Sequence, residues 1–337
     1  MRSVTQRAPD QALPFRRRLG GVETAARRVT FGIKTTQLNL SYGEILRVWR
    51  EADDVDVFEH AWLWDHMVPL RGDVNGATLE AWTLLSALAA QTKRLRLGVI
   101  VTSNRLRNPA LLAKMAATVD IISGGRLEFG IGAGGSRVPD PQALAMVHRE
   151  YDAYGVDVVA TSEALAALDE ACTIVKRMWS ESEPFDFDGR CYRLHGAVCE
   201  PKPIQQPHPP ILIGAGGERI ALRIVAQHAD IWNCPTNNVE DFRHKNSVLN
   251  EHCRAVGRDP GEITRSVQVL VASEGPRARP AHLPQVLGPA AVRDQLVDLI
   301  DAGVSHVVLA AIQPIPAVRW LAEEIVEPVL GRVRDSS

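Results

Sequence analysis

The sequence has few cysteines, and their spacing suggests neither a disulfide framework nor a metal site. The five residues form an odd number with no C-x-x-C pair and no clustered histidine: Cys172, Cys191, Cys199, Cys234 and Cys253. This pattern favours neither bridges nor zinc, so we expect no metal and a reducing, cytoplasmic location.

Long apolar runs are also absent. The longest candidates, such as residues 84–90, are far shorter than the roughly 18 residues that a membrane-spanning helix needs. Residues 1–28 contain several arginines but no apolar segment after them, which argues against a secretory signal. We expect these residues to form a mobile basic tail.

An excess of either charge is missing as well. Lys plus Arg number 38 and Asp plus Glu 40, for a net charge of −2. The near balance argues against nucleic acid or a membrane as a partner and leaves a small-molecule substrate. At 45% hydrophobic and 23% charged, the 337 residues are typical of a globular chain, either two domains or one large α/β barrel.

Apolar segments alternate with segments of helical period along the chain. The expected strands are 29–36, 61–64, 95–102, 127–131, 211–213, 230–232, 266–272 and 306–310. The expected helices are 42–57, 78–91, 109–122, 163–179, 218–226, 239–256, 290–301 and 317–330, with a polar hairpin-like excursion over 184–198. Eight such units predict a (β/α)8 TIM barrel over residues 29–337, with insertions after strands 4 and 7. An open doubly wound sheet is the alternative.

In such a barrel the functional residues follow the strands. Asp65 and His66 end the second strand, and a carboxylate beside an imidazole is a common acid/base unit. The alternative is a helix-capping Asp next to a surface His.

The loop after the third strand is polar and basic. Thr102, Arg105, Arg107 and Asn108 are candidate ligands for an anionic cofactor group at a helix N-terminus. A solvated turn is the alternative.

Two glycine-rich loops follow the fourth and fifth strands. Gly132, Ala133 and Gly134 let a flat ligand approach the backbone closely. Gly214, Ala215, Gly216 and Gly217 run toward a helix and form a candidate phosphate cradle. A tight turn without ligand uses similar glycines, and neither loop is a dinucleotide fingerprint or a P-loop.

In order, these segments resemble the luciferase-like family, in particular the branch that uses the deazaflavin coenzyme F420. The resembling stretches are 31–34, 61–66, 95–98, 108–114, 123–134 and 210–217. The resemblance implies Asp65 and His66 beside the cofactor ring, and a bulge, often with a non-proline cis peptide, near Ile100 and Val101. It also implies that Gly214, Gly216 and Gly217 hold the cofactor phosphate, and we expect a homodimer.

The chain departs from family members that oxidise a sugar phosphate. It has Leu70 where they carry Trp, Gly135 where they carry Glu, and no acidic residue in 37–39 after the first strand. Residues 135–156, including Arg137, resemble a divergent substrate loop.

The leading hypothesis is therefore an F420-dependent reductase that transfers hydride to a C=C or C=N bond. His66 is the candidate for the acid or for stabilising the charge of the ring, and Asp65 orients it or contacts the ring. One alternative is a monooxygenase that uses reduced FMN. The other is a barrel that binds a ligand without turnover.

Overall fold

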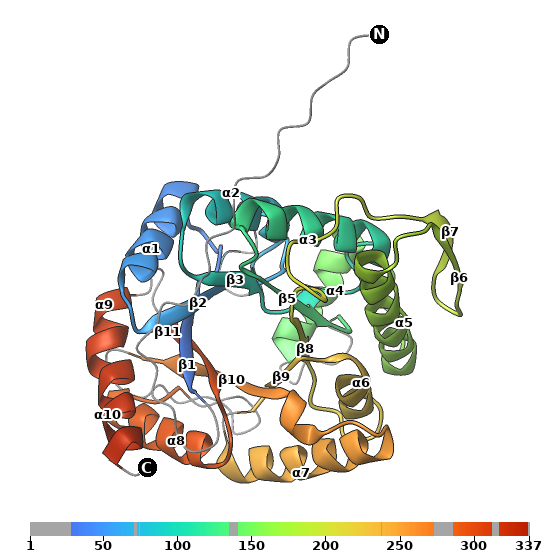
Figure 1. Ribbon diagram of the computed structural model, residues 1–337. Helices are drawn as coiled ribbons and strands as arrows, with labels where there is room; N and C mark the ends of the chain where they lie inside the picture. Colours follow the sequence, from blue (N-terminus) through green and yellow to red (C-terminus); the bar gives the residue numbers. More distant parts are fainter. Residues whose placement is uncertain are drawn as a thin grey trace, which may run out of the picture.

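Figure 1 shows a ring of strands inside a ring of helices in the computed structural model, which describes residues 28–70, 73, 75–134, 141–236, 238–272, 286–311 and 317–335. The barrel strands are β1 (Thr30–Lys34), β2 (Phe58–Leu63), β3 (Arg96–Val99), β4 (Thr102–Ser103), β5 (Leu127–Gly132), β8 (Ile211–Gly214), β9 (Ile231–Cys234), β10 (Thr264–Val271) and β11 (His306–Ala311). Their pairs are parallel, and β3 pairs with β5 to close the sheet. Because β4 continues β3 after a short break, the fold is the expected (β/α)8 barrel and not an open sheet.

Helices surround this barrel (Figure 1). They are α1 (Tyr42–Asp54), α2 (Ala81–Gln91), α3 (Pro109–Ser123), α4 (Pro141–Ala153), α5 (Thr161–Ser180), α6 (Ala221–His228), α7 (Val239–Ala255), α8 (Pro289–Asp301), α9 (Val318–Leu321) and α10 (Glu327–Asp335), the last two joined by a π-helical turn over Ala322–Val326. One of the helices, α4, lies inside their ring beside β5 and β8 (Figure 1). None of the described helices is both long and apolar enough to span a membrane.

Local signals in the sequence explain where α3 begins and ends. The Asn108 side chain accepts a hydrogen bond from Ala110 N at 2.9 Å, and Pro109 occupies the first turn, where its missing N–H costs nothing. The helix ends at Gly124, whose φ of 68° is the left-handed conformation that glycine adopts without strain.

Three expected helix boundaries are corrected. α1 ends at Asp54 rather than at residue 57, and α6 begins at Ala221 rather than at Glu218. α2 begins at Ala81 rather than at residue 78, because the Glu80 carboxylate accepts hydrogen bonds from the first backbone N–H groups and acts as the cap.

The largest correction concerns the segment expected to be a substrate loop. Residues 141–153 form the helix α4, and its buried face includes Val147, Glu150 and Tyr151. The spacing of these residues places them on one side of a helix. A carboxylate in the middle of the buried face hides the helix from an analysis based on apolar period.

The excursion after α5 is confirmed as an antiparallel hairpin of β6 (Phe185–Asp188) and β7 (Arg193–Ala197). Figure 1 shows it on the outer side of α5. The expected basic tail lies outside the described residues except for Arg28, which pairs with Glu59 at 2.8 Å. Most of the insertion after β10, residues 273–285, also lies outside them.

The inside of the barrel is more polar than the apolar strands predict. Strand residues facing the helices, such as Phe31 and Leu97, belong to the main apolar core. At the amino ends of the strands, the rings of His60 and His306 stack with centroids 3.9 Å apart, and Glu128 lies between His306 and Arg96. Arg96 Nε lies 2.5 Å from Glu128 Oε1, so this buried carboxylate has a cationic partner.

Candidate active site

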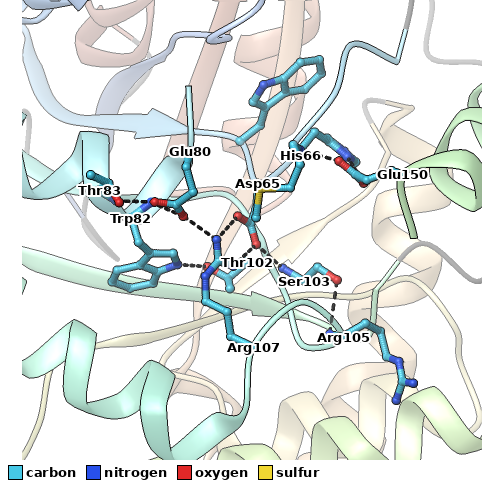
Figure 2. A network of polar contacts seen from close by, with 12 residues as sticks. Asp65, His66, Glu80, Trp82, Thr83, Thr102, Ser103, Arg105, Arg107 and Glu150 are labelled. Atoms are coloured by element: carbon cyan, nitrogen blue, oxygen red, sulfur yellow. Dashed lines mark hydrogen bonds and ion pairs between the residues drawn. The ribbon is translucent and has the colours of Figure 1, made fainter. Parts of the chain in front are cut away.

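The carboxyl ends of the strands hold a buried ion-pair network centred on Arg107 (Figure 2). Its guanidinium binds Asp65 in two places, with Nη1–Oδ2 at 2.8 Å and Nη2–Oδ1 at 2.9 Å, and Nη2 also lies 2.5 Å from Glu80 Oε1. The side chains of Asp65 and Arg107 are 1% and 8% exposed. Two parallel N–H donors on one carboxylate fix both the distance and the orientation of the pair.

The two carboxylates of this network differ in acidity. Burial raises the pKa of Asp65, although the bonds from Arg107 and from Ser103 N oppose that rise. Burial also acts to raise the pKa of Glu80, but the hydrogen bonds from Thr83 and Trp82 outweigh it and leave this pKa lowered. Both carboxylates, although they differ in pKa, bind the same cation, Arg107.

Gln37, in the stretch after the first strand, fixes the point where β2 ends. Its side chain is buried, and its amide pairs with both backbone groups of Trp64: Nε2 donates to the carbonyl at 2.8 Å, and Oε1 accepts from Trp64 N at 3.3 Å. The amide thus forms with Trp64 the two backbone hydrogen bonds that a neighbouring strand would otherwise form. The pairing extends in this way one residue beyond Leu63. Asp65 leaves the sheet immediately after this clamp.

His66 is held by α4. Its Nδ1 lies 3.0 Å from Glu150 Oε2, and since a carboxylate only accepts, Nδ1 carries the hydrogen. Glu150 also accepts from the backbone N–H groups of Met67 and Val68. The His66 side chain is 26% exposed, whereas that of Glu150 is 1% exposed. The imidazole therefore has one nitrogen bound to a buried anion, while its side chain remains partly open at the mouth.

The expected pairing of Asp65 with His66 is not what the structure shows. The two neighbours belong to separate ion pairs, Asp65 with Arg107 and His66 with Glu150 (Figure 2). Adjacency in the sequence therefore does not make these two side chains a pair.

The bulge expected in the third strand is confirmed. The Ile100–Val101 peptide bond is cis and separates β3 from β4. Beyond it, Thr102 is buried and its Oγ1 accepts a hydrogen bond from Trp82 Nε1 at 3.1 Å. The Val101 side chain lies against the ends of β5 and β8, since a Cβ at Gly132 or Gly214 would come within 2.8 or 3.0 Å of it. These glycines therefore make room for Val101.

Gly134 ends the first glycine loop in a crowded place. Its φ is +89°, and a Cβ there would lie 2.5 Å from Arg105 Cγ, 2.7 Å from the Tyr151 hydroxyl and 3.1 Å from Ser103 Oγ. Only glycine satisfies both the backbone conformation and the space. The neighbouring Ala133 is partly buried against the core.

The second glycine loop offers free backbone donors. Ala215 N already donates a hydrogen bond to the Asn233 carbonyl at 3.2 Å. Within the described residues, the N–H groups of Gly216 and Gly217 have no hydrogen-bond partner, and a Cβ at Gly217 would meet only Ala221 Cβ at 3.5 Å. The helix α6 begins after this loop, so its N-terminus is close in sequence but does not follow Gly217 directly.

The candidate ligands after the third strand have different surroundings. Arg107 is buried and fully engaged by Asp65 and Glu80, so its placement does not fit the expected role in holding a cofactor tail. Arg105 is partly buried and donates to Asp157 O at 3.4 Å, and within the described chain its Nε has no partner. Asn108 caps α3.

Of the candidate substrate residues, Leu70 is partly buried, whereas Gly135 and Arg137 lie outside the described residues. Sequence reasoning missed Gln37 as a clamp, Glu80 as a partner of Arg107 and Glu150 as the partner of His66. The glutamates carried no motif, and only the three-dimensional fold brings them to the mouth.

Comparison with known proteins places this chain in a family. The sequence profile of the luciferase-like monooxygenase family matches residues 24–285. The chain therefore belongs to the luciferase-like monooxygenase family, as its motifs predicted.

Particular relatives differ in how much of the chain they match. The F420-dependent glucose-6-phosphate dehydrogenase of Kineococcus radiotolerans is 28% identical over 93% of this chain and 90% of that protein. A phthiodiolone/phenolphthiodiolone dimycocerosates ketoreductase of a Mycobacterium species is 32% identical, but over 60% of this chain and only 50% of that protein. The structure of the coenzyme F420-dependent tetrahydromethanopterin reductase of Methanopyrus kandleri superposes with a TM-score of 0.72, covering 89% of this chain and 99% of that one. At 19% identity, the last likeness shows the fold alone.

Proposed function

We propose that this chain is an oxidoreductase that uses coenzyme F420 and passes a hydride from the reduced cofactor to a C=C or C=N carbon of a small organic substrate. The observation that carries the proposal is His66, an imidazole held by a buried glutamate at the same mouth as the strand-three bulge and both glycine loops. The relative that matches almost the whole chain is named for its dependence on F420, which supports the choice of cofactor.

The residues present fit such a cofactor in two respects. A deazaflavin tail carries a phosphodiester and carboxylates. The N–H groups of Gly216 and Gly217, which have no partner among the described residues, suit an anion. A flat ring needs an apolar surface to lie against, and the Val101 side chain, for which Gly132 and Gly214 make room, offers one at the ends of the strands. When bound, the cofactor supplies the hydride, and the protein supplies position and charge.

His66 is the proposed proton donor. With Nδ1–H bound to Glu150, the other nitrogen, Nε2, is the one that can give a proton to the substrate. After it does so, the neutral ring keeps its hydrogen on Nδ1, where the buried carboxylate holds it. Glu150 thus fixes both the orientation and the tautomer of the ring, in the way that carboxylate partners of histidine commonly do.

Asp65 has a positioning role in this proposal. It binds Arg107 and accepts a hydrogen bond from Ser103 N at 2.9 Å. Asp65 therefore ties the end of β2 to β4, directly after the bulge. The proposal does not require it to contact the substrate.

Anaerobic turnover tests the proposal. Reduced F420 is mixed with the protein and a panel of compounds with activated C=C, C=N and C=O bonds, and reoxidation is followed by absorbance. The proposal predicts substrate-dependent reoxidation by the wild type. A protein that binds the cofactor tightly but does not reoxidise it with any compound would instead be the ligand-binding barrel.

A flavin-dependent monooxygenase is the second candidate, because the matching family profile is that of luciferase-like monooxygenases. Oxygen activation requires the ring nitrogen of FMN that a deazaflavin replaces with carbon. Oxygen consumption with reduced FMN, but no turnover with reduced F420, would favour this candidate. The homodimer and the cytoplasmic location remain predictions from the sequence.

A further inference from the structure

Lys34 places a positive charge at the end of β1. This charge takes part in none of the ion pairs described above for the site. Its Nζ donates to Gln268 Oε1 at 2.9 Å, and the residue is half-buried. Desolvation by the surrounding protein lowers the pKa of the ammonium to about 8. Buried charges normally have a partner of opposite charge, because removing an unpaired charge from water is unfavourable.

Lys34 has no carboxylate partner in the part of the chain that the structure describes. The carboxylates of Glu59, on β2, and Asp65, just beyond it, are already paired, with Arg28 and Arg107 respectively. The titratable groups on or just beyond the strands packed against this region are Glu59, His60, Asp65, His66, Arg265 and His306. The ammonium is thus left with a neutral amide oxygen as its partner.

A chain of hydrogen bonds fixes that amide. Gln268 Nε2 donates to Asn233 Oδ1 at 2.9 Å, and Asn233 Nδ2 donates to Ser266 Oγ at 2.9 Å. Ser266 Oγ in turn lies 2.8 Å from His306 Nδ1. Since each amide donates through nitrogen, the Gln268 oxygen must face Lys34. The acceptor for the ammonium is therefore built into the barrel.

Lys34 also lies at the catalytic end of the barrel. It is the register partner of Trp62 on β2, and Thr35 N donates to the Trp62 carbonyl at 2.9 Å. Asp65 and His66 follow Trp62 closely along the same strand end. In a (β/α)8 barrel the carboxyl ends of the strands form the site, so this charge belongs to the same mouth as His66.

We propose that Lys34 is the counter-ion for the negative charge of the reduced cofactor ring. This inference rests on the proposed function. Lys34 ends one of the stretches that resemble the family, residues 31–34, but the sequence analysis gave it no role. A reduced deazaflavin ring holds two more electrons than the oxidised ring, and it is negatively charged unless a proton compensates. A lysine without its own carboxylate stabilises that charge, and the protein gains preference for the reduced form.

The proposal predicts which form binds more tightly and how protons move. Wild-type protein binds reduced F420 more tightly than oxidised F420. Binding of the anion raises the pKa of Lys34, so near pH 8 the protein takes up a fraction of a proton, about half at most. Calorimetric titrations in two buffers with different ionisation enthalpies measure that uptake, and they need no turnover.

Lys34→Met tests the proposal directly. The variant should lose about tenfold more affinity for reduced than for oxidised F420, which corresponds to about 30 mV for a two-electron couple. It should also lose the proton uptake. Lys176→Met is the matched control, because Lys176 is a partly desolvated lysine on α5 and its pKa is also lowered by burial. The control should bind both forms as the wild type does.

Gln268→Glu gives a second test that keeps the lysine. The new carboxylate would pair with Lys34 inside the protein and compete with the ring. The preference for reduced F420 should therefore fall although no cation has been removed, and this test remains if Lys34→Met does not fold.

Equal losses of affinity for the two forms in Lys34→Met, or an unchanged preference in both variants, would overturn the role of Lys34 while leaving F420 as the cofactor. Wild-type protein that binds neither form of F420 would instead contradict the proposed function, and the counter-ion role with it.

Discussion

Glu150 on α4 accepts a hydrogen bond from His66 Nδ1 at 3.0 Å, although 84 residues separate them along the chain. The same carboxylate accepts from the backbone N–H groups of the next two residues, Met67 and Val68. One buried side chain therefore holds both the imidazole and the backbone that carries it. The orientation of His66 depends on α4, which lies in the segment after β5.

Replacing His66 with alanine should lower turnover by roughly 10²- to 10⁴-fold, because it removes the proposed proton donor. Affinity for reduced F420 should stay within a few-fold, since the glycine loops hold the cofactor. Single-turnover kinetics and equilibrium titration separate the two effects. His195→Ala, on the exposed hairpin, is the control. An unchanged rate in His66→Ala would remove this residue from the mechanism.

Arg107 and Arg105 should respond differently to substitution, although they are two positions apart. Arg107→Met leaves Asp65 buried without a cation and should lower the free energy of unfolding by about 3 kcal/mol. Adding Asp65→Asn should recover part of the loss, because the unpaired charge is then gone. Urea unfolding of the single and double variants measures both effects. A double variant no more stable than Arg107→Met would show that the buried charge is not the cause.

Arg105→Ala should leave stability nearly unchanged and weaken F420 binding by at most about 1 kcal/mol, as expected for a partly exposed charge. The loss should shrink at high salt, where screening removes the same attraction from the wild type. Titrations at low and high ionic strength check this. A loss that is independent of salt would argue against an electrostatic contact with the anionic tail.

The fold was predictable because the strands and helices of the barrel correspond to local patterns of residues in the sequence. The β-branched run of β1, the proline and glycine that bound α3 and the polar hairpin after α5 each depend on neighbouring residues. α4 was missed because helices were expected where apolar residues recur at helical spacing, and one residue of its buried face is the charged Glu150.

The site was only partly predictable. Motifs indicated His66 and the glycine loops, which remain proposed ligands, and they indicated the bulge that the cis peptide confirms. They could not assign partners: Asp65 binds Arg107 rather than His66, because side-chain contacts across the barrel are set by tertiary packing. The sequence gave Lys34 no role, and what singles it out is that it has no carboxylate partner among the residues that the structure describes.

Acid should destabilise the protein through Glu128. Burial alone would raise the pKa of this carboxyl, but the Arg96 guanidinium and the His306 imidazole outweigh it and hold the pKa well below its usual range. The folded state thus binds this proton less readily than the unfolded state, whose value is about 4.3. The contribution is present above that value and is lost as the pH falls below it.

Urea unfolding at several pH values checks this expectation. Stability of the wild type should fall steeply below about pH 4.3, and Glu128→Gln should show a shallower fall. Glu262→Gln, at an exposed position, is the control and should follow the wild type. Parallel curves for Glu128→Gln and the wild type would show that this carboxyl does not set the acid limit.

Glucose 6-phosphate should not be oxidised, even though one relative is named for that reaction. Leu70 stands where sugar-phosphate dehydrogenases of the family carry tryptophan, and it offers only a partly buried aliphatic side chain. The reduction of oxidised F420 by this sugar phosphate is followed by absorbance. Dehydrogenation above a cofactor-only control would mean that the comparison at Leu70 misplaced the substrate site.

The choice of cofactor is the central claim, and direct titration of the unmodified protein with F420 and with FMN tests it most directly. The deazaflavin carries more negative charge than FMN. The mouth offers the cation of Lys34 and the N–H groups of Gly216 and Gly217, which have no partner in the described part of the chain. The account predicts saturable binding of F420, tighter in its reduced form, and much weaker binding of FMN. Tight binding of FMN without binding of F420 would contradict the account and favour the monooxygenase.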